Sequence, residues 1–367
     1  MCTSLLGLVF ILFSSSGGLQ STETLRPPVD VYVAGEGGYH TYRIPAIVST
    51  NDGTLLAFAE GRKAGQGDSG DIDLVLRRSS DQGATWTEQQ VLWNDGANTC
   101  GNPCPVVDRT TGQIHLLMTR NLGTDTESMI IDQTSTESRS VWTMTSDDDG
   151  VTWSTPREIT SSVKAPDWTW YATGPGNGIQ LRSKPHANRL VIPCDHIQAG
   201  TKKYYSHVIY SDDGGDTWKI GGITPTDQVN ECAVAENHDG TLLLNMRNYD
   251  RTKRSRAQSR SADGGLTWST VEHNEQLPEP ICQASMISLD DGLRLVFSNP
   301  ASESARVRMT VRGSLDGGTN WSEGLVLHEG PSAYSSLVGL DEDSAGCLYE
   351  CGERSPYERI RFQLVDG

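Results

Sequence analysis

The sequence predicts an all-β protein, a β-propeller with six blades. The first observation is an octapeptide pattern, Ser-x-Asp-x-Gly-x-Thr-Trp, that occurs at 79–86, 146–153, 211–218 and 261–268 and, with Asn for Thr, at 314–321. The second is the interval between successive copies, 50 to 67 residues, which holds about four strands of about six residues with their loops. Four-stranded units repeated around an axis form a propeller, and a chain of 367 residues suits one such domain.

Each copy of the pattern, called an Asp box below, is expected to be a hairpin turn. A short carboxylate accepts hydrogen bonds from backbone N–H groups a few residues on, and Gly takes the positive φ that a tight turn needs. Alternating apolar residues flank the first box, at 73–77 and again at 91–93. A calcium loop is the alternative, but each box has too few acidic positions for the EF-hand pattern. The boxes are therefore interpreted as structural.

Five Asp boxes are compatible with six blades because residues with strand character lie outside them. About fifty such residues precede the first box and about forty-five follow the last. An open edge strand promotes aggregation, so we expect Val29–Val33 to complete the last blade beside Arg359–Val365. No linker or low-complexity tract interrupts the chain. Residues 21–367 are therefore predicted to form a single propeller domain.

The first twenty residues differ from the rest. An apolar run, Leu5–Phe13, is followed by the small residues Ser14–Gly18. This pattern resembles a signal peptide over residues 1–20, although no Lys or Arg precedes the apolar run, and the run is too short to span a bilayer. We expect secretion, with a lysosome-like compartment as the alternative, and no membrane span further along the chain.

Net charge and cysteine usage limit the partners. A formal charge of −17 argues against nucleic acid and anionic membranes, so an anionic substrate would need a local cationic pocket. Cys2 would leave with the signal peptide, and the remaining seven cysteines cannot all pair within one chain. Cys347 and Cys351 are too far apart in a strand to bond each other. We expect most cysteines to be buried small hydrophobes, and we expect neither a metal nor a cofactor.

Several stretches carry residues suited to chemistry. Arg43 lies in a predicted strand, and Asp68 lies in a Gly-rich loop between two predicted strands. Glu231 and Arg247 fall on adjacent strands of a predicted hairpin, and Tyr334 follows the last Asp box. Taken singly, each has an ordinary explanation, such as a surface ion pair for the arginine or a solvated turn for the aspartate.

Three further arginines, at positions 306, 308 and 312, are expected to lie in one strand. All three positions are even-numbered, so in a regular strand their side chains would point to the same face of the sheet. The alternation of side chains along a strand therefore does not distinguish one of these arginines from the others. The loop from Trp168 to Asn177, with its three aromatic residues, is either a rigid wall for a ligand or a packed loop.

Taken together, these stretches resemble the exo-α-sialidases (neuraminidases) of bacteria and animals. The resemblance covers essentially the whole chain after residue 20. It rests on the Asp boxes and on Arg-Ile-Pro at 43–45, Thr-Gly-Pro-Gly at 173–176, Glu231 with Arg247, and Tyr334 with Leu-Tyr-Glu at 348–350. The fifth box departs from the pattern, since Asn320 replaces Thr.

The resemblance implies a role for each of eight residues. A clamp of three arginines binds the substrate carboxylate, one glutamate holds an arm of the clamp, and a fourth arginine lies near the sugar's 4-hydroxyl. A tyrosine acts as nucleophile with a glutamate as its partner, and an aspartate acts as acid and base. Matched to this sequence, these are Arg43, Arg247 and Arg306; Glu350; Arg62; Tyr334 with Glu231; and Asp68.

The implied activity is retaining hydrolysis of terminal sialic acids from glycans, glycoproteins or glycolipids, by a monomer, through a covalent sialyl-tyrosine. Arginine forks bind carboxylates in a bidentate manner. A neutral phenol approaches the carboxylate-bearing anomeric carbon without the repulsion that an anion would meet. Two alternatives stay open: transfer of the sialyl group to a sugar or to its own hydroxyl, and a sialoside-binding propeller without turnover. The second would not need Asp68, Glu231 and Tyr334 together.

Overall fold

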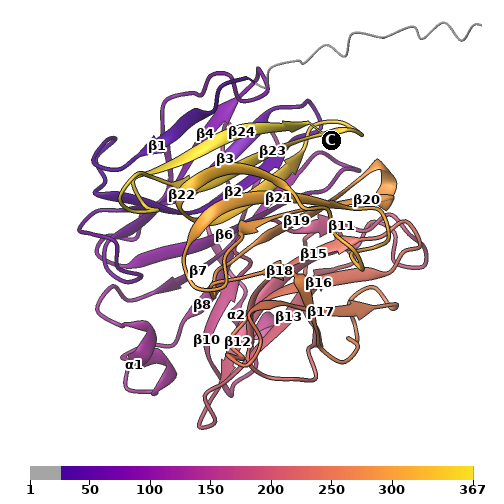
Figure 1. Cartoon of the computed structure of the whole chain (residues 1–367). Coiled ribbons are helices and arrows are strands. Elements are labelled where there is room, and N and C mark those ends of the chain that lie inside the picture. Colours follow the sequence, from indigo (N-terminus) through magenta and orange to yellow (C-terminus); the bar gives the residue numbers. More distant parts are fainter. Residues whose placement is uncertain (1–25, 367) are drawn as a thin grey trace, which may run out of the picture.

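The computed structural model describes residues 26–366, and β-strands dominate this part of the chain (Figure 1). It contains 24 strands, two short α-helices and one 3₁₀ turn. The prediction of an all-β fold is confirmed. The expected signal peptide, residues 1–20, lies outside the described residues. Within residues 26–366, no helix has the length and apolarity to cross a membrane.

The N-terminal sheet has eight strands in the order β2-β3-β4-β6-β7-β8-β9, with β5 paired to β4. All of its neighbours are antiparallel except β4 and β6, which share a single parallel bridge between Ile72 and Thr99. Its strands are β2 (Thr41–Ser49), β3 (Leu55–Arg62), β4 (Ile72–Ser79), β5 (Gln90–Trp93), β6 (Thr99–Val107), β7 (Ile114–Asn121), β8 (Ser140–Ser146) and β9 (Arg157–Glu158). Helices α1 (Glu127–Ile131) and α2 (Thr160–Val163) flank β8 and β9 in the chain.

Two smaller antiparallel sheets follow. One has the order β10-β12-β13-β14, with β11 also paired to β12, and the other has the order β15-β16-β17-β18. Their strands are β10 (Trp168–Thr173), β11 (Ile179–Gln180), β12 (Leu190–Gln198), β13 (Lys203–Ser211), β14 (Lys219–Ile223), β15 (Val229–Glu236), β16 (Leu242–Asn248), β17 (Ser255–Ser261) and β18 (Glu272–Pro278).

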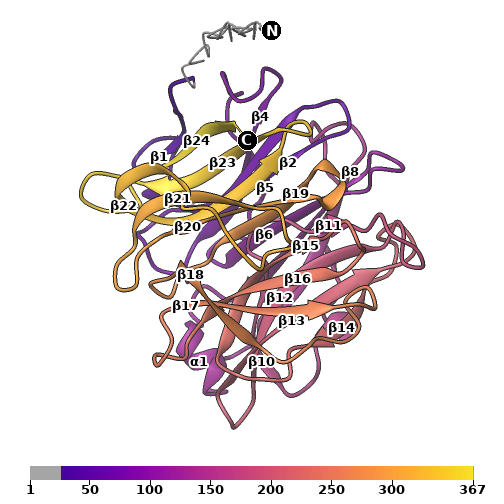
Figure 2. The same cartoon turned by 45° about the vertical axis from the view of Figure 1, so that its right-hand side comes forward.

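The fourth sheet joins the two ends of the described chain. Its order is β1-β24-β23-β22-β21-β20-β19, so the first strand is at its edge beside the last, as Figures 1 and 2 show. The members are β1 (Val29–Val33), β19 (Ser285–Leu289), β20 (Arg294–Pro300), β21 (Val307–Ser314), β22 (Leu325–Gly339), β23 (Ser344–Cys351) and β24 (Arg359–Asp366), with the 3₁₀ turn η1 (Asp290–Gly292) between β19 and β20.

The pairing of β1 with β24 confirms the predicted contact between the ends. Val29 lies opposite Phe362 and Val33 opposite Arg359. On the outside of this pair, Asp30 accepts from Arg359 Nη1 at 3.0 Å and from Arg361 Nε at 2.6 Å. Exposed ion pairs are each worth only about 0–1 kcal/mol, so the backbone ladder and the buried residues of β24 are the main connection.

The Asp boxes are turns closed by their own side chains, as predicted. In the first box, Ser79 Oγ accepts from Gly83 N at 2.8 Å, and Asp81 accepts from Thr85 N and Oγ1 at 2.9 and 2.6 Å. The fifth box keeps this geometry because Asn320 Nδ2 donates to Asp316 Oδ2 at 2.7 Å, in place of the Thr hydroxyl. No group of three or more potential metal ligands is found among the described residues.

The core lies between the sheets. Strands β2, β6 and β15 are buried along almost their whole length, because both of their faces are covered. All seven cysteines from Cys100 onward are buried and unbonded, and in this respect they behave as small hydrophobes. Cys347 and Cys351 both lie in β23 without a bond between them, as their spacing predicts.

Candidate active site

Seven of the eight residues singled out by the sequence line one pocket of about 470 Å³. Its walls come from all four sheets and from α1, so residues far apart in the chain meet there. The eighth residue, Glu350, is fully buried directly behind the pocket, where it binds Arg43.

A tyrosine, a glutamate and an arginine form the centre of the pocket. Tyr334, on β22, donates its hydroxyl to Glu231 Oε1 at 2.6 Å. Arg247 Nη1 lies 2.6 Å from Glu231 Oε2 and 3.1 Å from the Tyr334 oxygen. Glu231 and Arg247 come from the paired strands β15 and β16, as expected. Burial and the Glu231 charge raise the pKa of Tyr334 well above its ordinary value, so the resting phenol is neutral, although three arginines oppose the shift.

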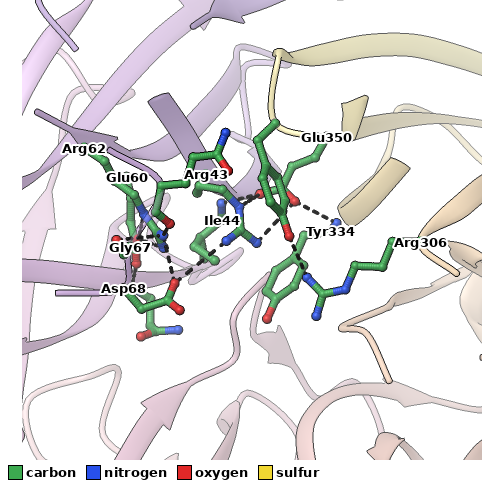
Figure 3. Close-up of polar contacts among 12 residues, drawn as sticks. Arg43, Ile44, Glu60, Arg62, Gly67, Asp68, Arg306, Tyr334 and Glu350 are labelled. Carbon is green, nitrogen blue, oxygen red and sulfur yellow. Dashed lines mark hydrogen bonds and ion pairs between the residues drawn. The ribbon is translucent and has the colours of Figure 1, made fainter. Parts of the chain in front are cut away.

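Glu350 holds Arg43 and the backbone of the tyrosine together. Its Oε1 accepts from Arg43 Nε at 2.8 Å and from Ile44 N at 2.9 Å. Its Oε2 accepts from Arg43 Nη2 at 3.4 Å and from Tyr334 N at 3.0 Å. Figure 3 shows Glu350 behind Arg43, on the side away from Asp68.

The strand that carries Arg43 is bent at the next residue. Ile44 has a φ of 58°, which is strained for a β-branched side chain, and the pairing of β2 with β3 shifts between Arg43 and Ala46. The bend aims the Ile44 N–H at Glu350, and the guanidinium of Arg43 lies 4.0 Å from the centre of the Tyr357 ring.

The structure separates Arg306 from Arg308 and Arg312, so the expectation that all three share a face is wrong. Arg306 precedes β21 and lines the pocket, where Nη1 donates to Tyr357 at 2.9 Å and Nη2 to the Ile281 carbonyl at 3.2 Å. Arg308 has a φ of 63°, at a point where the pairing of β21 with β22 shifts, and it forms an exposed ion pair with Glu329. Arg312 lines a separate groove on the outside of the fold. The bulge at Arg308 breaks the alternation on which the parity argument relied.

The Gly-rich loop between β3 and β4 brings an acid to the pocket rim. Asp68 Oδ1 lies 2.8 Å from Arg62 Nη1 and 3.8 Å from Arg43 Nη1, as Figure 3 shows. Arg62 is itself fixed by Glu60, whose Oε2 lies 2.6 Å from Nη2. Partial burial raises the pKa of Asp68, but Arg62 and Arg43 outweigh it and hold that pKa below its ordinary value.

The expected local positive charge is confined to one side of the pocket. The lining holds five arginines and five carboxylates, so the pocket as a whole is not cationic. Around Tyr334, however, Arg43 and Arg306 lie 5.0 and 5.6 Å from the ring centre and Arg247 contacts the hydroxyl. This side can bind an anion, and the opposite side is mixed in charge.

Sequence reasoning missed most of that opposite side. The additional lining residues include Asn102, Glu127, Arg139, Asp195 and Tyr249. Trp170, from the aromatic stretch whose role was left open, also lines the pocket. None of these positions has a spacing pattern that would have identified it, because each reaches the pocket through the packing of separate sheets.

Comparison with known proteins places the chain in a family. Residues 53–347 match the model of the BNR repeat-like domain. A sialidase of Micromonospora viridifaciens is 35% identical over 94% of this chain, although the chain spans only 55% of that relative's length. Sialidase-3 of Mus musculus is 32% identical over 88% of this chain and 90% of the relative.

A solved structure supports the same assignment. The Hadza microbial sialidase Hz136 superimposes with a TM-score of 0.82 at 34% identity, covering 92% of this chain and 68% of that one. The described residues thus combine an Asp-box fold with an arginine-lined pocket centred on a tyrosine and a glutamate. The chain belongs to the sialidase family of glycoside hydrolases.

Proposed function

We propose that the chain is a retaining exo-α-sialidase that hydrolyses terminal sialic acids of glycans, glycoproteins or glycolipids through a covalent sialyl-tyrosine. The observation that carries this proposal is the 2.6 Å hydrogen bond from Tyr334 to Glu231 inside an arginine-lined pocket. A binding protein would need the arginines, but it would not need a phenol paired with a base and an acid at the rim. The names of the similar proteins point to the same activity.

The arginines orient the substrate. Arg43, Arg247 and Arg306 surround the Tyr334 ring, and Arg247 Nε has no hydrogen-bond partner within residues 26–366. A sialic acid carboxylate bound here would place the anomeric carbon, to which it is attached, over the phenol oxygen. The carboxylate also compensates the three positive charges that the acidic chain gathers at this point.

In the first step, the Tyr334 oxygen forms a bond to the anomeric carbon and the bond to the aglycone oxygen breaks. The phenol proton passes to Glu231, which already accepts its hydrogen bond. Asp68, in its protonated form, gives a proton to the departing oxygen. Because Arg62 and Arg43 favour the charged form of Asp68, we expect this step to need acidic conditions, or a substrate carboxylate that compensates Arg43.

In the second step, water replaces the tyrosine. Asp68, now a carboxylate, takes a proton from a water molecule whose oxygen attacks the anomeric carbon, and the bond to Tyr334 breaks. Glu231 returns its proton to the tyrosine oxygen, so the residues end as they began. Two displacements at one carbon predict retention of configuration.

The strand pairing supports six blades. The single bridge between β4 and β6 divides the eight-stranded sheet into two groups of four. The fifteen-residue β22 pairs with β21 through its first half and with β23 through its second half, which divides the seven-stranded sheet in the same way. With the two middle sheets, this makes six antiparallel groups.

A second cavity supports the same count. This cavity, of about 330 Å³, is lined by residues of one strand from each of the six groups. Those strands are β2, β6, β11, β15, β19 and β22. Strands from every group thus converge on one axis, as the inner strands of propeller blades do.

The remaining predictions concern the whole protein. Three of them stay proposals: that residues 21–367 form one catalytic propeller, that the protein acts as a monomer, and that it is secreted or delivered to a lysosome-like compartment. The last proposal rests on the Leu5–Phe13 pattern. Transfer of the sialyl group to a sugar or to its own hydroxyl is the alternative outcome of the same covalent intermediate.

Proton NMR of the purified protein acting on a sialyllactose tests the proposal. We expect α-sialic acid to form first and to mutarotate afterwards. Early appearance of the β-anomer would exclude the double displacement. Accumulation of an anhydro sugar or a new sialoside would assign the chain to the transferases. Broadened substrate signals without turnover would identify a binding protein.

A further inference from the structure

Lys164 is a buried cation behind the wall of the pocket. It follows α2, is 8% exposed, and is not one of the residues that line the pocket. Its ammonium group donates to Ser138 Oγ at 2.7 Å, to the Arg139 carbonyl at 2.6 Å and to the Thr169 carbonyl at 2.8 Å. An ammonium group has three N–H donors, so all of them are used. Within residues 26–366 these partners are neutral acceptors, and no carboxylate forms an ion pair with Lys164.

The three acceptors belong to two different sheets and lie next to residues that line the pocket. Ser138 and Arg139 lead into β8 of the N-terminal sheet, whereas Thr169 lies in β10 of the next sheet. The Thr169 carbonyl is part of the peptide bond that leads to Trp170, and both Arg139 and Trp170 line the pocket. In the wall, the Arg139 guanidinium lies 3.9 Å from the centre of the Trp170 ring. Lys164 thus connects the backbones of two side chains that contact each other.

Regular strand pairing does not fix this part of the wall. The pairing of β10 with β12 shifts between Trp168 and Tyr171, so the backbone around Trp170 lies in an irregular stretch of the strand. The pairing of β8 with β7 begins at Ser140, one residue after Arg139. The Lys164 ammonium group therefore supplies hydrogen bonds at one place where the register is interrupted and at another where it has not yet begun.

We propose that Lys164 is a positioning residue for substrate binding, whose ammonium group holds Arg139 and Trp170 in the geometry that binds the sugar. Lys164 does not touch the substrate and takes no part in bond breaking. Without the ammonium group two buried carbonyls lose their donor, so the wall relaxes. We expect the affinity for the substrate to fall while the chemical step at Tyr334 changes little. This inference rests on the proposed sialidase function and adds a residue outside the pocket that controls affinity.

The charge of Lys164 makes this support dependent on pH. Burial, and then the charge of Arg139, lower the pKa of Lys164 to about 7. Above that pH the neutral amine has two N–H donors and a lone pair, so one of the three acceptors loses its hydrogen bond. Arg139 keeps its charge throughout. His196, which also interacts with Lys164, stays neutral because burial, and then the Lys164 charge, lower its pKa to about 3. We therefore expect affinity to decrease as the pH rises through about 7.

Binding of an analogue without a glycosidic bond separates affinity from chemistry. Calorimetry with 2-deoxy-2,3-didehydro-N-acetylneuraminic acid gives Kd at a series of pH values on both sides of the Lys164 pKa. We expect Kd to be constant on the acid side of a midpoint near about 7. On the alkaline side Kd should rise by about tenfold, the equivalent of one lost hydrogen bond. A flat profile would overturn the inference.

Two variants assign the titration to Lys164. Lys164→Met removes the ammonium group, so Kd at acid pH should rise by about tenfold and should no longer change with pH, while kcat stays close to that of the native protein. Ser138→Ala removes one acceptor at an exposed position. A hydrogen bond to the charged form favours that form, so its loss should move the midpoint to lower pH. A midpoint that does not move would assign the titration to another group and overturn the inference.

Lys203→Met is the matched control. Lys203 lies at the start of β13, is 51% exposed and does not line the pocket, so this variant removes the same charge from the surface. We expect its Kd and pH profile to match those of the native protein. An equal loss of affinity in both lysine variants would indicate a general effect of charge and overturn the inference. If Lys164→Met does not fold, the native profile and Ser138→Ala decide.

The same measurements distinguish this inference from the proposed function. Hydrolysis of sialyllactose together with a flat binding profile would leave the sialidase proposal standing and remove the role of Lys164. The expected profile without hydrolysis would remove the sialidase proposal and keep the role of Lys164 in sialoside binding. If the analogue does not bind at all, both fall.

Discussion

The replacement Glu350→Gln removes one charge from the most connected carboxylate of the site and leaves the volume unchanged. Glu350 is fully buried, and its four contacts join Arg43, the Ile44 N–H and the Tyr334 N–H. An amide keeps only one of the two accepting oxygens, so its NH₂ group would face two donors. The change thus disturbs an arm of the clamp and the backbone of the nucleophile together.

The expected loss of stability follows from the burial of the pair. Arg43 is 5% exposed, and without Glu350 its nearest carboxylate is Asp68, at 3.8 Å. Removing one partner of a buried ion pair costs about 3–5 kcal/mol, because the other charge stays buried without compensation. A displacement of the tyrosine by about 1 Å should also lower kcat/KM by about 100-fold.

Urea unfolding and initial-rate kinetics measure the two effects. Glu236→Gln is the matched control, since Glu236 is also buried and accepts from the backbone of Arg182 and Ser183 at 2.7 and 2.9 Å, but it lines the cavity at the other end of β15. We expect the control to lower stability and leave kcat/KM unchanged. A loss of less than about 1 kcal/mol with full activity in Glu350→Gln would refute the reasoning.

Three other variants test separate parts of the mechanism. Tyr334→Phe should lower kcat by about a thousandfold or more while a sialic acid analogue still binds, and calorimetry with kinetics checks both. Arg306→Ala should reduce kcat/KM by about 100-fold and Arg312→Ala should have little effect; the reverse order would move the third arm of the clamp. Arg62→Met should raise the pKa of Asp68, because a cation that favours the carboxylate is lost. Since Asp68 acts in its protonated form in the first step, the alkaline limb of kcat/KM should move up by about one pH unit, and an unmoved or lowered limb would contradict the role of Asp68.

Much of the fold could be predicted because the chain repeats its turns. The Asp boxes marked the ends of five strands, and the need to cover an open edge predicted the pairing of β1 with β24. The site residues Tyr334 and Glu231 came from a resemblance to a known family, and the structure places them 2.6 Å apart. Local pattern alone would have left each of them with an ordinary explanation.

The rest could not be predicted because it depends on local backbone irregularity or on distant packing. The prediction that Arg306, Arg308 and Arg312 share a face failed at Arg308. This residue has a positive φ that interrupts the alternation of side chains, and an arginine in the sequence does not predict such a φ. Arg139 precedes β8 and Asp195 lies on β12 of another sheet, and only their shared cavity brings them together. A period-2 pattern describes one strand at a time, so it does not indicate which residues of separate sheets line the same cavity.

Trapping of the covalent intermediate tests the central claim most directly. A 2,3-difluorinated sialic acid carries a good leaving group at the anomeric carbon, and the fluorine at C3 slows hydrolysis of the intermediate because it withdraws electrons from that carbon. After brief incubation and proteolysis, mass spectrometry should find the fluorosialyl group on the peptide that contains Tyr334, with fragmentation assigning it to the tyrosine oxygen. The Tyr334→Phe variant should acquire no label. A label on Glu231 or Asp68 would contradict the proposed mechanism, as would rapid turnover of the natural substrate by a protein that is never labelled.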